Sequence, residues 1–169
     1  MKETNIVTNI LVCDYTELSD EQKKLVDLAK EACLTAYAPY SQFNVGAAAL
    51  LDNGEIITGS NQENAAYPSG TCAERTTLFY AGARYPNQAV TKLAIAAYKG
   101  NSYTATPTAP CGACRQVILE TEHRYNTPIE ILLYGTEKTY IITSIESVLP
   151  KHRGNNDSID VIMYVFSVP

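Results

Sequence analysis

Hydrophobic and polar positions follow a helical period from Ser19 to about Tyr37. Apolar residues recur there on one face, at Leu25, Leu28, Ala29, Ala32 and Cys33. Such a stripe is typical of an amphipathic helix that covers a core. Ser19 is a suitable N-cap, and Gln22 three residues later completes a capping box. The pattern predicts a helix here and a buried, apolar role for Cys33.

Shorter apolar runs predict strands and further helices along the rest of the chain. Residues 44–51 and 55–60 form two predicted strands around Asp52-Asn53-Gly54, which is a strong hairpin turn signal. The small residues at 46–49 indicate that a helix packs closely on the first strand. Further strands are predicted at 90–98, 129–134 and 140–143, and helices at 72–83, 111–123 and 144–149.

This order of elements predicts an α/β fold, a three-layer α/β/α arrangement around a mixed sheet of about five strands. Residues 1–169 are assigned to a single domain, since no repeat or linker divides them. Residues 1–18 are treated as an N-terminal arm and 151–169 as a C-terminal extension. The apolar stretch at 159–166 is compatible with an edge strand or with an interface, and the sequence does not decide between them.

Composition changes this picture only by excluding some functions. The 169 residues are 46% hydrophobic and 18% charged, with a net charge of -5 at pH 7. Lysines and arginines are scattered, so no basic stripe for a phosphate backbone is expected and nucleic acid is a disfavoured partner. Neither a signal peptide nor a membrane-spanning run is recognised, so a cytoplasmic protein without a membrane partner is expected.

Three of the five cysteines carry the chemistry that the pattern predicts. Cys72 lies at the start of one predicted helix, and Cys111 and Cys114 lie at the start of another. A helix N-terminus favours thiolate over thiol, so the three sulfurs are suitable ligands for one zinc ion. A structural zinc site fills its fourth position with protein, whereas a catalytic site leaves that position for water. With Glu74 beside Cys72, the count of three sulfurs predicts zinc-activated hydrolysis.

Two other interpretations of these residues remain open at this point. Cys111 and Cys114 alone have the spacing of a thioredoxin-like redox pair. Glu74 could complete a capping box with Thr71, in which its carboxylate would only bind the backbone of the helix start. The third cysteine, in a matching setting, favours the zinc site over both.

The cysteine motifs also resemble those of a known family. The chain is similar to the cytidine deaminases of the small, homotetrameric branch in four stretches, which are residues 36–48, residues 61–67 and the two cysteine motifs. These motifs are Cys72-Ala73-Glu74-Arg75 and Pro110-Cys111-Gly112-Ala113-Cys114-Arg115-Gln116. The resemblance covers roughly residues 20–150. Related deaminases of polynucleotides usually have histidine in the place of Cys72, so cysteine there indicates the nucleoside branch.

The resemblance implies hydrolytic deamination of cytidine and deoxycytidine to uridine and deoxyuridine plus ammonia, in pyrimidine salvage. It implies one zinc ion per subunit, held by Cys72, Cys111 and Cys114, and a homotetramer. Glu74 is then the catalytic residue that carries protons between the water, the ring and the leaving amine.

Arg75 has an expected electrostatic role. Zinc(II) with three thiolates carries a formal charge of about −1, which opposes the activation of a water molecule. A guanidinium that donates to a thiolate withdraws electron density and restores the Lewis acidity of the metal. The resemblance implies the same part for Arg75, the alternative being a solvent-exposed helix arginine.

Four residues are expected to bind substrate by resemblance. Phe43 is similar to the aromatic residue that packs on the pyrimidine ring, Asn61 and Glu63 to the pair that binds the ribose hydroxyls, and Ala73 to the residue whose backbone N–H holds the ring carbonyl. Phe43 could instead be a core residue, and Asn61 and Glu63 could lie in a solvated loop. Because the Glu63 carboxylate would repel a phosphate, free nucleosides are expected to be preferred over nucleotides.

The chain departs from the family after Leu149-Pro150. Many members have a phenylalanine three residues on, where this chain has Arg153, so no residue is assigned to that contact. A deaminase of another cytosine nucleoside, such as a blasticidin-type antibiotic, is the main alternative, and a structural zinc module is a weaker one. The sequence does not decide between cytidine and deoxycytidine.

Overall fold

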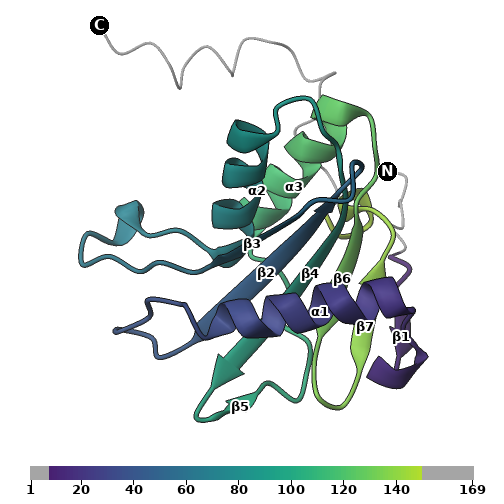
Figure 1. The fold of residues 1–169 in the computed structure, drawn as a ribbon. Helices are drawn as coiled ribbons and strands as arrows, with labels where there is room; N and C mark the ends of the chain where they lie inside the picture. The colour runs from purple at the N-terminus through teal and green to yellow at the C-terminus, as the bar shows by residue number, and fades with distance from the viewer. Residues whose placement is uncertain (1–7, 150–169) are drawn as a thin grey trace, which may run out of the picture.

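The computed structural model describes residues 8–149, and these residues build one mixed sheet with helices on both faces (Figure 1). The helices are α1 (Asp20–Cys33), α2 (Ala73–Arg84) and α3 (Gly112–Tyr125), and short 3₁₀ turns are η1 (Tyr15–Glu17), η2 (Tyr67–Ser69) and η3 (Ile145–Val148). The strands are β1 (Leu11–Cys13), β2 (Asn44–Leu51), β3 (Ile56–Ser60), β4 (Val90–Lys99), β5 (Ser102–Tyr103), β6 (Glu130–Tyr134) and β7 (Thr139–Ile142). The three-layer α/β fold predicted from the sequence is confirmed.

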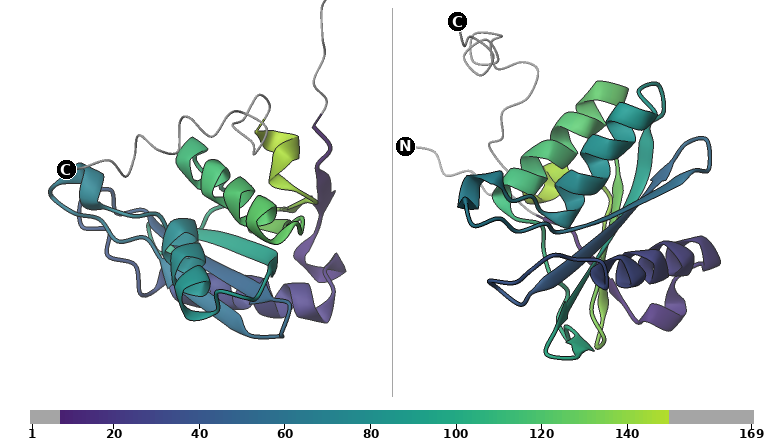
Figure 2. Two further views of the ribbon diagram at one scale, coloured as in Figure 1. Left: turned by 90° about the horizontal axis from the view of Figure 1, so that it is seen from above. Right: turned by 60° about the vertical axis from the view of Figure 1, so that its left-hand side comes forward.

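The sheet runs in the order β1-β7-β6-β4-β2-β3, and β5 extends β4. Strands β4 and β6 are parallel, as expected for two strands joined by a crossover helix, and the other pairs are antiparallel. Helix α1 covers one face of the sheet, while α2 and α3 lie next to each other on the opposite face (Figures 1 and 2). Two apolar cores result, one on each side of the sheet.

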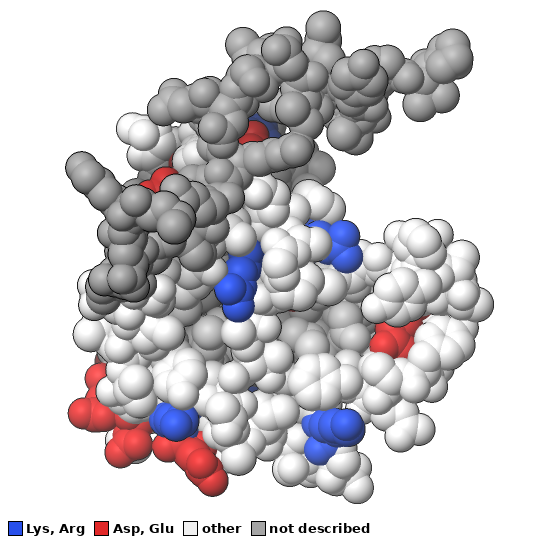
Figure 3. Space-filling model, turned by 180° about the vertical axis from the view of Figure 1, so that it is seen from behind, with Lys and Arg blue, Asp and Glu red and all other residues white. Residues whose placement is uncertain are grey.

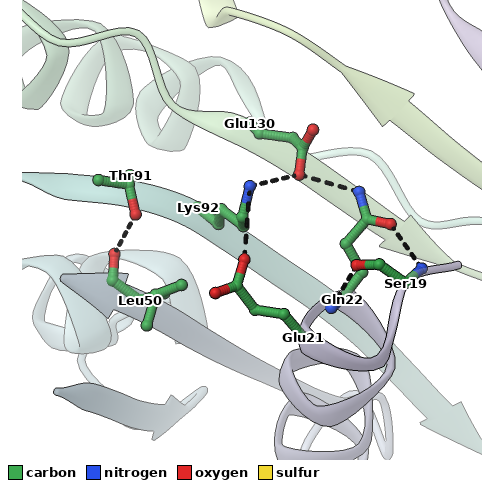
Figure 4. Close-up of polar contacts among 7 residues, drawn as sticks. All are labelled: Ser19, Glu21, Gln22, Leu50, Thr91, Lys92 and Glu130. Carbon is green, nitrogen blue, oxygen red and sulfur yellow. Dashed lines mark hydrogen bonds and ion pairs between the residues drawn. The ribbon is translucent and has the colours of Figure 1, made fainter. Parts of the chain in front are cut away.

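Helix α1 begins as its sequence predicts and is fixed to the sheet at that end. The Ser19 hydroxyl accepts from the Gln22 backbone N–H, and Gln22 Oε1 accepts from the Ser19 N–H, which completes the capping box. Gln22 Nε2 also donates to Glu130 on β6, and Lys92 on β4 donates to the same carboxylate at 3.0 Å (Figure 4). These contacts set the position of α1 across β4 and β6.

The close approach of α1 to β2 depends on Gly46. A Cβ atom built there would lie 2.1 Å from the Ala29 carbonyl oxygen and 2.5 Å from the Cys33 amide nitrogen. The predicted close packing of a helix on the small residues of this strand is therefore confirmed. Cys33 is fully buried, and its thiol donates to the carbonyls of Ala29 and Ala96, so its apolar, structural role is confirmed too.

The expected number of about five strands is too low, since the sheet has seven strands within residues 8–149 alone. The two extra strands are only three and two residues long, and tertiary contacts hold them. In β1, the Cys13 thiol donates to the Thr139 carbonyl on β7. In β5, the Tyr103 ring packs against Tyr98 and Tyr134.

Helix α1 also ends at Cys33, earlier than the predicted end near Tyr37. The N–H groups of Leu34, Thr35 and Ala36 bond to carbonyls three residues back, so the chain leaves the helix in tight turns before Pro39.

Glu122, a buried carboxylate of α3, joins this helix to the segments that follow it. Its Oε1 accepts the backbone N–H of Ile129 at 2.8 Å and of Ile145 at 3.1 Å, and its Oε2 accepts the Ser144 hydroxyl. One side chain thus fixes both the entry to β6 and the start of η3.

The variant Glu122→Ala is expected to lower the free energy of unfolding by about 3 kcal/mol, because it leaves buried N–H groups without an acceptor. Urea denaturation measures this loss. The matched control is Glu120→Ala on the exposed side of the same helix, where a change within about 0.5 kcal/mol is expected. Equal stability losses in the two variants would contradict the role of Glu122.

Candidate active site and metal centre

Two helix starts place the three predicted zinc ligands together. Cys72 is the N-cap of α2 and Cys111 is the N-cap of α3, while Cys114 lies in the first turn of α3. Both N-caps have extended backbone and make no side-chain capping bond, so their sulfurs remain available. The prediction that each cysteine motif lies where a loop enters a helix is confirmed.

The geometry of the three sulfurs fits a single zinc ion. All three Sγ atoms lie within 4.8 Å of one another, and those of Cys111 and Cys114 are 3.4 Å apart. Zn–S bonds of about 2.3 Å in tetrahedral geometry place sulfurs about 3.8 Å apart, which is close to this arrangement. Cys114 is buried, Cys72 is half-buried and Cys111 is exposed, so the cluster opens to solvent on one side. The donor set fits one zinc ion per chain.

Arg75 lies against this cluster. Its Nη2 donates to Cys72 Sγ at 3.8 Å, and its buried Nε has no hydrogen-bond partner among the described residues. The pKa of Cys72 falls to about 5, because the Cys114 thiol donates to its sulfur and because the Arg75 guanidinium lies beside it. The same hydrogen bond raises the pKa of Cys114. Arg75 therefore lies against the cluster and not free at the surface, and its positive charge favours the thiolate form of Cys72.

Glu74 is buried beside the cysteines, with only 4% of its surface exposed. The cap of α2 is Cys72, so Glu74 is the second helical residue and does not form the capping box with Thr71 that its sequence allowed. Burial raises the pKa of Glu74, and the negative charge on Cys72 raises it further. A carboxyl group whose pKa moves toward neutrality is suited to both taking and giving a proton. Ala73, between ligand and carboxylate, is fully buried.

Asn61 and Glu63 lie together and bind the backbone of the loop that carries Phe43. Asn61 Oδ1 accepts the Val45 N–H at 2.7 Å, and its Nδ2 donates to the Phe43 carbonyl at 3.0 Å. Glu63 Oε2 accepts the N–H groups of Tyr40 at 2.9 Å and Ser41 at 3.3 Å. These contacts fix both side chains against the loop. Phe43 is partly buried.

Backbone pairing connects this second group to the cysteine cluster. Gln62 lies between Asn61 and Glu63, and it forms a parallel bridge with Tyr37 on one side and an antiparallel bridge with Thr71 on the other. The two hydrogen bonds between Gln62 and Thr71 are both 2.9 Å long. Thr71 directly precedes Cys72, so the predicted sugar-binding residues and the predicted metal ligand lie on neighbouring segments.

Arg115, a residue of the second cysteine motif, has a structural role that the sequence did not reveal. Arg115 Nε donates to the Pro110 carbonyl at 2.9 Å, directly before Cys111, and its Nη1 donates to the Val148 carbonyl at 2.8 Å. Arg115 therefore ties the loop before the second cysteine motif to η3. Its partners are backbone atoms 5 and 33 residues away, so no local pattern could reveal them.

An α/β/α sandwich with three thiols and one buried carboxylate at two adjacent helix starts defines a zinc-binding enzyme of the deaminase type. The family model for the "cytidine and deoxycytidylate deaminase zinc-binding region" matches residues 19–126. The chain belongs to this family. Among the described residues, no helix is long and apolar enough to span a bilayer.

Relatives and solved structures agree with this family. A cytidine deaminase of Halalkalibacterium halodurans is 43% identical over 100 residues, which are 59% of this chain and 71% of the relative. One of Sporosarcina psychrophila is 46% identical over 101 residues, covering 58% and 68% of the two chains. The crystal structure of a cytidine deaminase from Burkholderia pseudomallei superposes with a TM-score of 0.66 at 35% identity, covering 80% of this chain and all of that one.

Proposed function

We propose that this protein catalyses zinc-dependent hydrolytic deamination of cytidine and deoxycytidine, giving uridine and deoxyuridine plus ammonia, as a step of pyrimidine salvage. The observation that carries the proposal is the buried Glu74 carboxylate beside three thiols that fit one zinc ion. Deaminase family membership supports the reaction type, and the cytidine deaminases among its relatives support the substrate.

Cys72, Cys111 and Cys114 would hold the metal, and zinc bound there would supply Lewis acidity that activates a water molecule near neutral pH. Glu74 takes the proton that the attacking water releases and delivers it to N3 of the cytosine ring, while the water oxygen bonds to C4. Glu74 then takes the remaining proton from the new C4 hydroxyl and passes it to the amine as the bond between C4 and the amine breaks, so that ammonia leaves and the uracil carbonyl remains. Burial of Glu74 keeps this exchange away from bulk solvent.

The remaining residues hold the nucleoside and adjust the site. Phe43 packs on the pyrimidine ring, the backbone N–H of Ala73 binds the ring carbonyl, and Asn61 and Glu63 bind the ribose hydroxyls. Arg75 limits the negative charge on the thiolates through its contact with Cys72.

Three further properties belong to the proposal. Exposed aromatic side chains on η2 and α2, at Tyr67, Phe79 and Tyr80, support a homotetramer in which other subunits cover them. All five cysteines are free thiols, which fits the reducing environment of the cytoplasm. Basic side chains on the face shown in Figure 3 lie apart from one another, which favours a small-molecule substrate over nucleic acid.

Cytidine is expected to have a kcat/KM at least about tenfold above that of its 5′-monophosphate, because the Glu63 carboxylate would lie near a sugar phosphate of like charge. Ultraviolet monitoring measures the turnover of cytidine, deoxycytidine, cytidine 5′-monophosphate and a blasticidin-type antibiotic. The zinc content of the same sample is measured alongside, and light scattering gives the mass of the oligomer. Turnover of the antibiotic alone would support the alternative deaminase. If the zinc-loaded protein converts none of these four compounds, the proposed activity is wrong and the site is a structural zinc site.

A further inference from the structure

Strand β1 lies at one edge of the sheet, beyond β7, and its apolar side chains are exposed (Figure 1). Leu11 is 61% exposed and Val12 is 60% exposed. Val12 is opposite Tyr140, whose ring packs against the core beneath α2 and α3. Leu11 is opposite Ile141, which packs against the core beneath α1. Because opposite residues of an antiparallel pair share a face, β1 exposes apolar surface on both faces of the sheet.

The outer edge of β1 has none of the usual protection of an edge strand. Within residues 8–149, β1 pairs with β7 alone. Natural sheets protect such an edge with charged side chains, with proline or with a covering segment, since its backbone N–H and C=O groups can pair with another strand. Residues 10–13 are Ile-Leu-Val-Cys, without a charge or a proline. This edge therefore has the composition of one that a further segment covers.

A cavity of about 290 Å³ adjoins β1 on the face of the sheet that carries α3. Ile10 of β1, Arg115 of α3 and Val148 of η3 all line it. Pro110, which directly precedes the zinc-ligand candidate Cys111, lines it as well. Most of the lining is apolar, so the cavity is suited to hydrophobic side chains and not to a charged ligand.

The described part of the chain ends beside this cavity. Thr8 Oγ1 donates to the Ser147 carbonyl at 2.6 Å, and Thr8 and Val148 both line the cavity. Residues 150–169 lie outside the described part of the chain, and they begin three residues after Ser147. The stretch 150–158 spans up to about 30 Å when extended, whereas β1 from Thr8 to Cys13 is about 17 Å long. Residues 159–166 can therefore reach any part of β1.

The sequence of residues 159–166 is complementary to β1. The stretch is Ile-Asp-Val-Ile-Met-Tyr-Val-Phe, which is rich in β-branched and aromatic residues, and Asp160 is its one charged residue. In a strand, neighbours such as Val161 and Ile162 point to opposite faces. Such a strand offers apolar side chains on both faces, as the exposed residues of β1 require.

We propose that residues 159–166 of the same chain form a strand that pairs with the outer edge of β1 and places side chains over the cavity. This strand extends the sheet, buries Leu11 and Val12, and shields the loop that holds Pro110 before the second cysteine motif. A short tether keeps its two ends at an effective concentration on the order of 1 mM, which favours pairing within one chain over pairing with a second copy. The inference concerns the fold and does not depend on the proposed function.

Amide hydrogen exchange compares the 169-residue chain with a variant that ends at Ser158. Residues 8–14 are expected to exchange at least about tenfold more slowly in the longer chain, because pairing protects the outward amides of β1. Strand β3, at the opposite edge of the sheet, is expected to exchange equally in both chains and reports that the shorter one is folded.

Two full-length variants remove the dependence on truncation. Val161→Asp/Ile162→Asp places a charge on each face of the proposed strand and is expected to exchange at residues 8–14 as fast as the truncated chain. Ser158→Asp introduces the same charge directly before the segment and is the matched control, expected to exchange like the parent. Equal exchange at residues 8–14 in the parent, the truncated chain and the double variant would overturn the proposal.

A photocross-linking residue identifies what covers β1. With benzoylphenylalanine in place of Tyr164, irradiation is expected to join position 164 to residues 8–14 or 107–110, and the product is expected to migrate as a single chain on a denaturing gel. A cross-linked dimer would show that a second copy covers the edge, and would overturn pairing within the chain. Cross-links only to other segments would overturn the proposal as well.

Discussion

Glu74→Gln is expected to lower kcat for cytidine by about 10²- to 10⁴-fold, which is the range for losing a positioned general acid–base. The amide has nearly the shape of the carboxyl group but cannot carry a proton between the water, N3 and the leaving amine. Because Glu74 is not among the three sulfur ligands and does not cap α2, the zinc content and the fold are expected to persist.

Steady-state kinetics with a zinc assay and a thermal melt on the same sample check this result. Glu120→Gln, on the exposed side of α3, is the control for loss of a helix carboxylate and is expected to keep full activity. Near-normal turnover in Glu74→Gln would remove Glu74 from the mechanism. If Glu74→Gln loses its zinc together with its activity, Glu74 instead has a structural role in holding the metal site.

Cys111→Ser is expected to reduce bound zinc from about one ion per chain toward none, and cytidine turnover with it. A hydroxyl stays protonated at neutral pH and is a poor zinc ligand, whereas the thiolate binds the metal directly. Cys111 is exposed, so this variant removes a ligand without opening a cavity in the core. Cys114→Ser, at the buried position, is expected to give the same zinc loss and a lower stability in addition.

The number of zinc ions per chain is measured by releasing the metal with a thiol-reactive reagent and detecting it with a chromogenic chelator. Cys13→Ser is the matched control, since Cys13 is not part of the three-sulfur cluster and its thiol donates to the Thr139 carbonyl on β7; zinc and activity are expected to be unchanged. Full zinc occupancy in both Cys111→Ser and Cys114→Ser would contradict the three-sulfur site.

The elements that were predictable from the sequence are those whose signals are local. The capping box of Ser19 and Gln22, the Asp52-Asn53-Gly54 turn and the helix starts at Cys72 and Cys111 are decided within a few residues. The cluster of three thiols was predictable for the same reason, since both cysteine motifs are short and each lies at the start of a helix.

The features that the sequence did not reveal depend on distant partners. Strand β5 is held by Tyr103, whose ring contacts residues on β4 and β6, and nothing in its own two residues has a strand period. The end of α1 at Cys33 follows from tight turns that helical spacing does not encode. The role of Arg115 depends on hydrogen bonds to backbone carbonyls of other segments, and such bonds leave no pattern in composition or period.

The paired bonds between Gln62 and Thr71 have a consequence for redesign of this scaffold. They bring the two ends of residues 63–70 together, so this segment is a surface loop with its two ends paired. Its tip includes Tyr67, which is 92% exposed. Lengthening such a loop adds little closure entropy, about 0.6 kcal/mol for each doubling. A segment inserted at the tip would therefore leave Cys72 anchored where Thr71 holds it. Changes in the length and sequence of this loop could then alter the substrate range and the subunit contacts while the metal site stays constant.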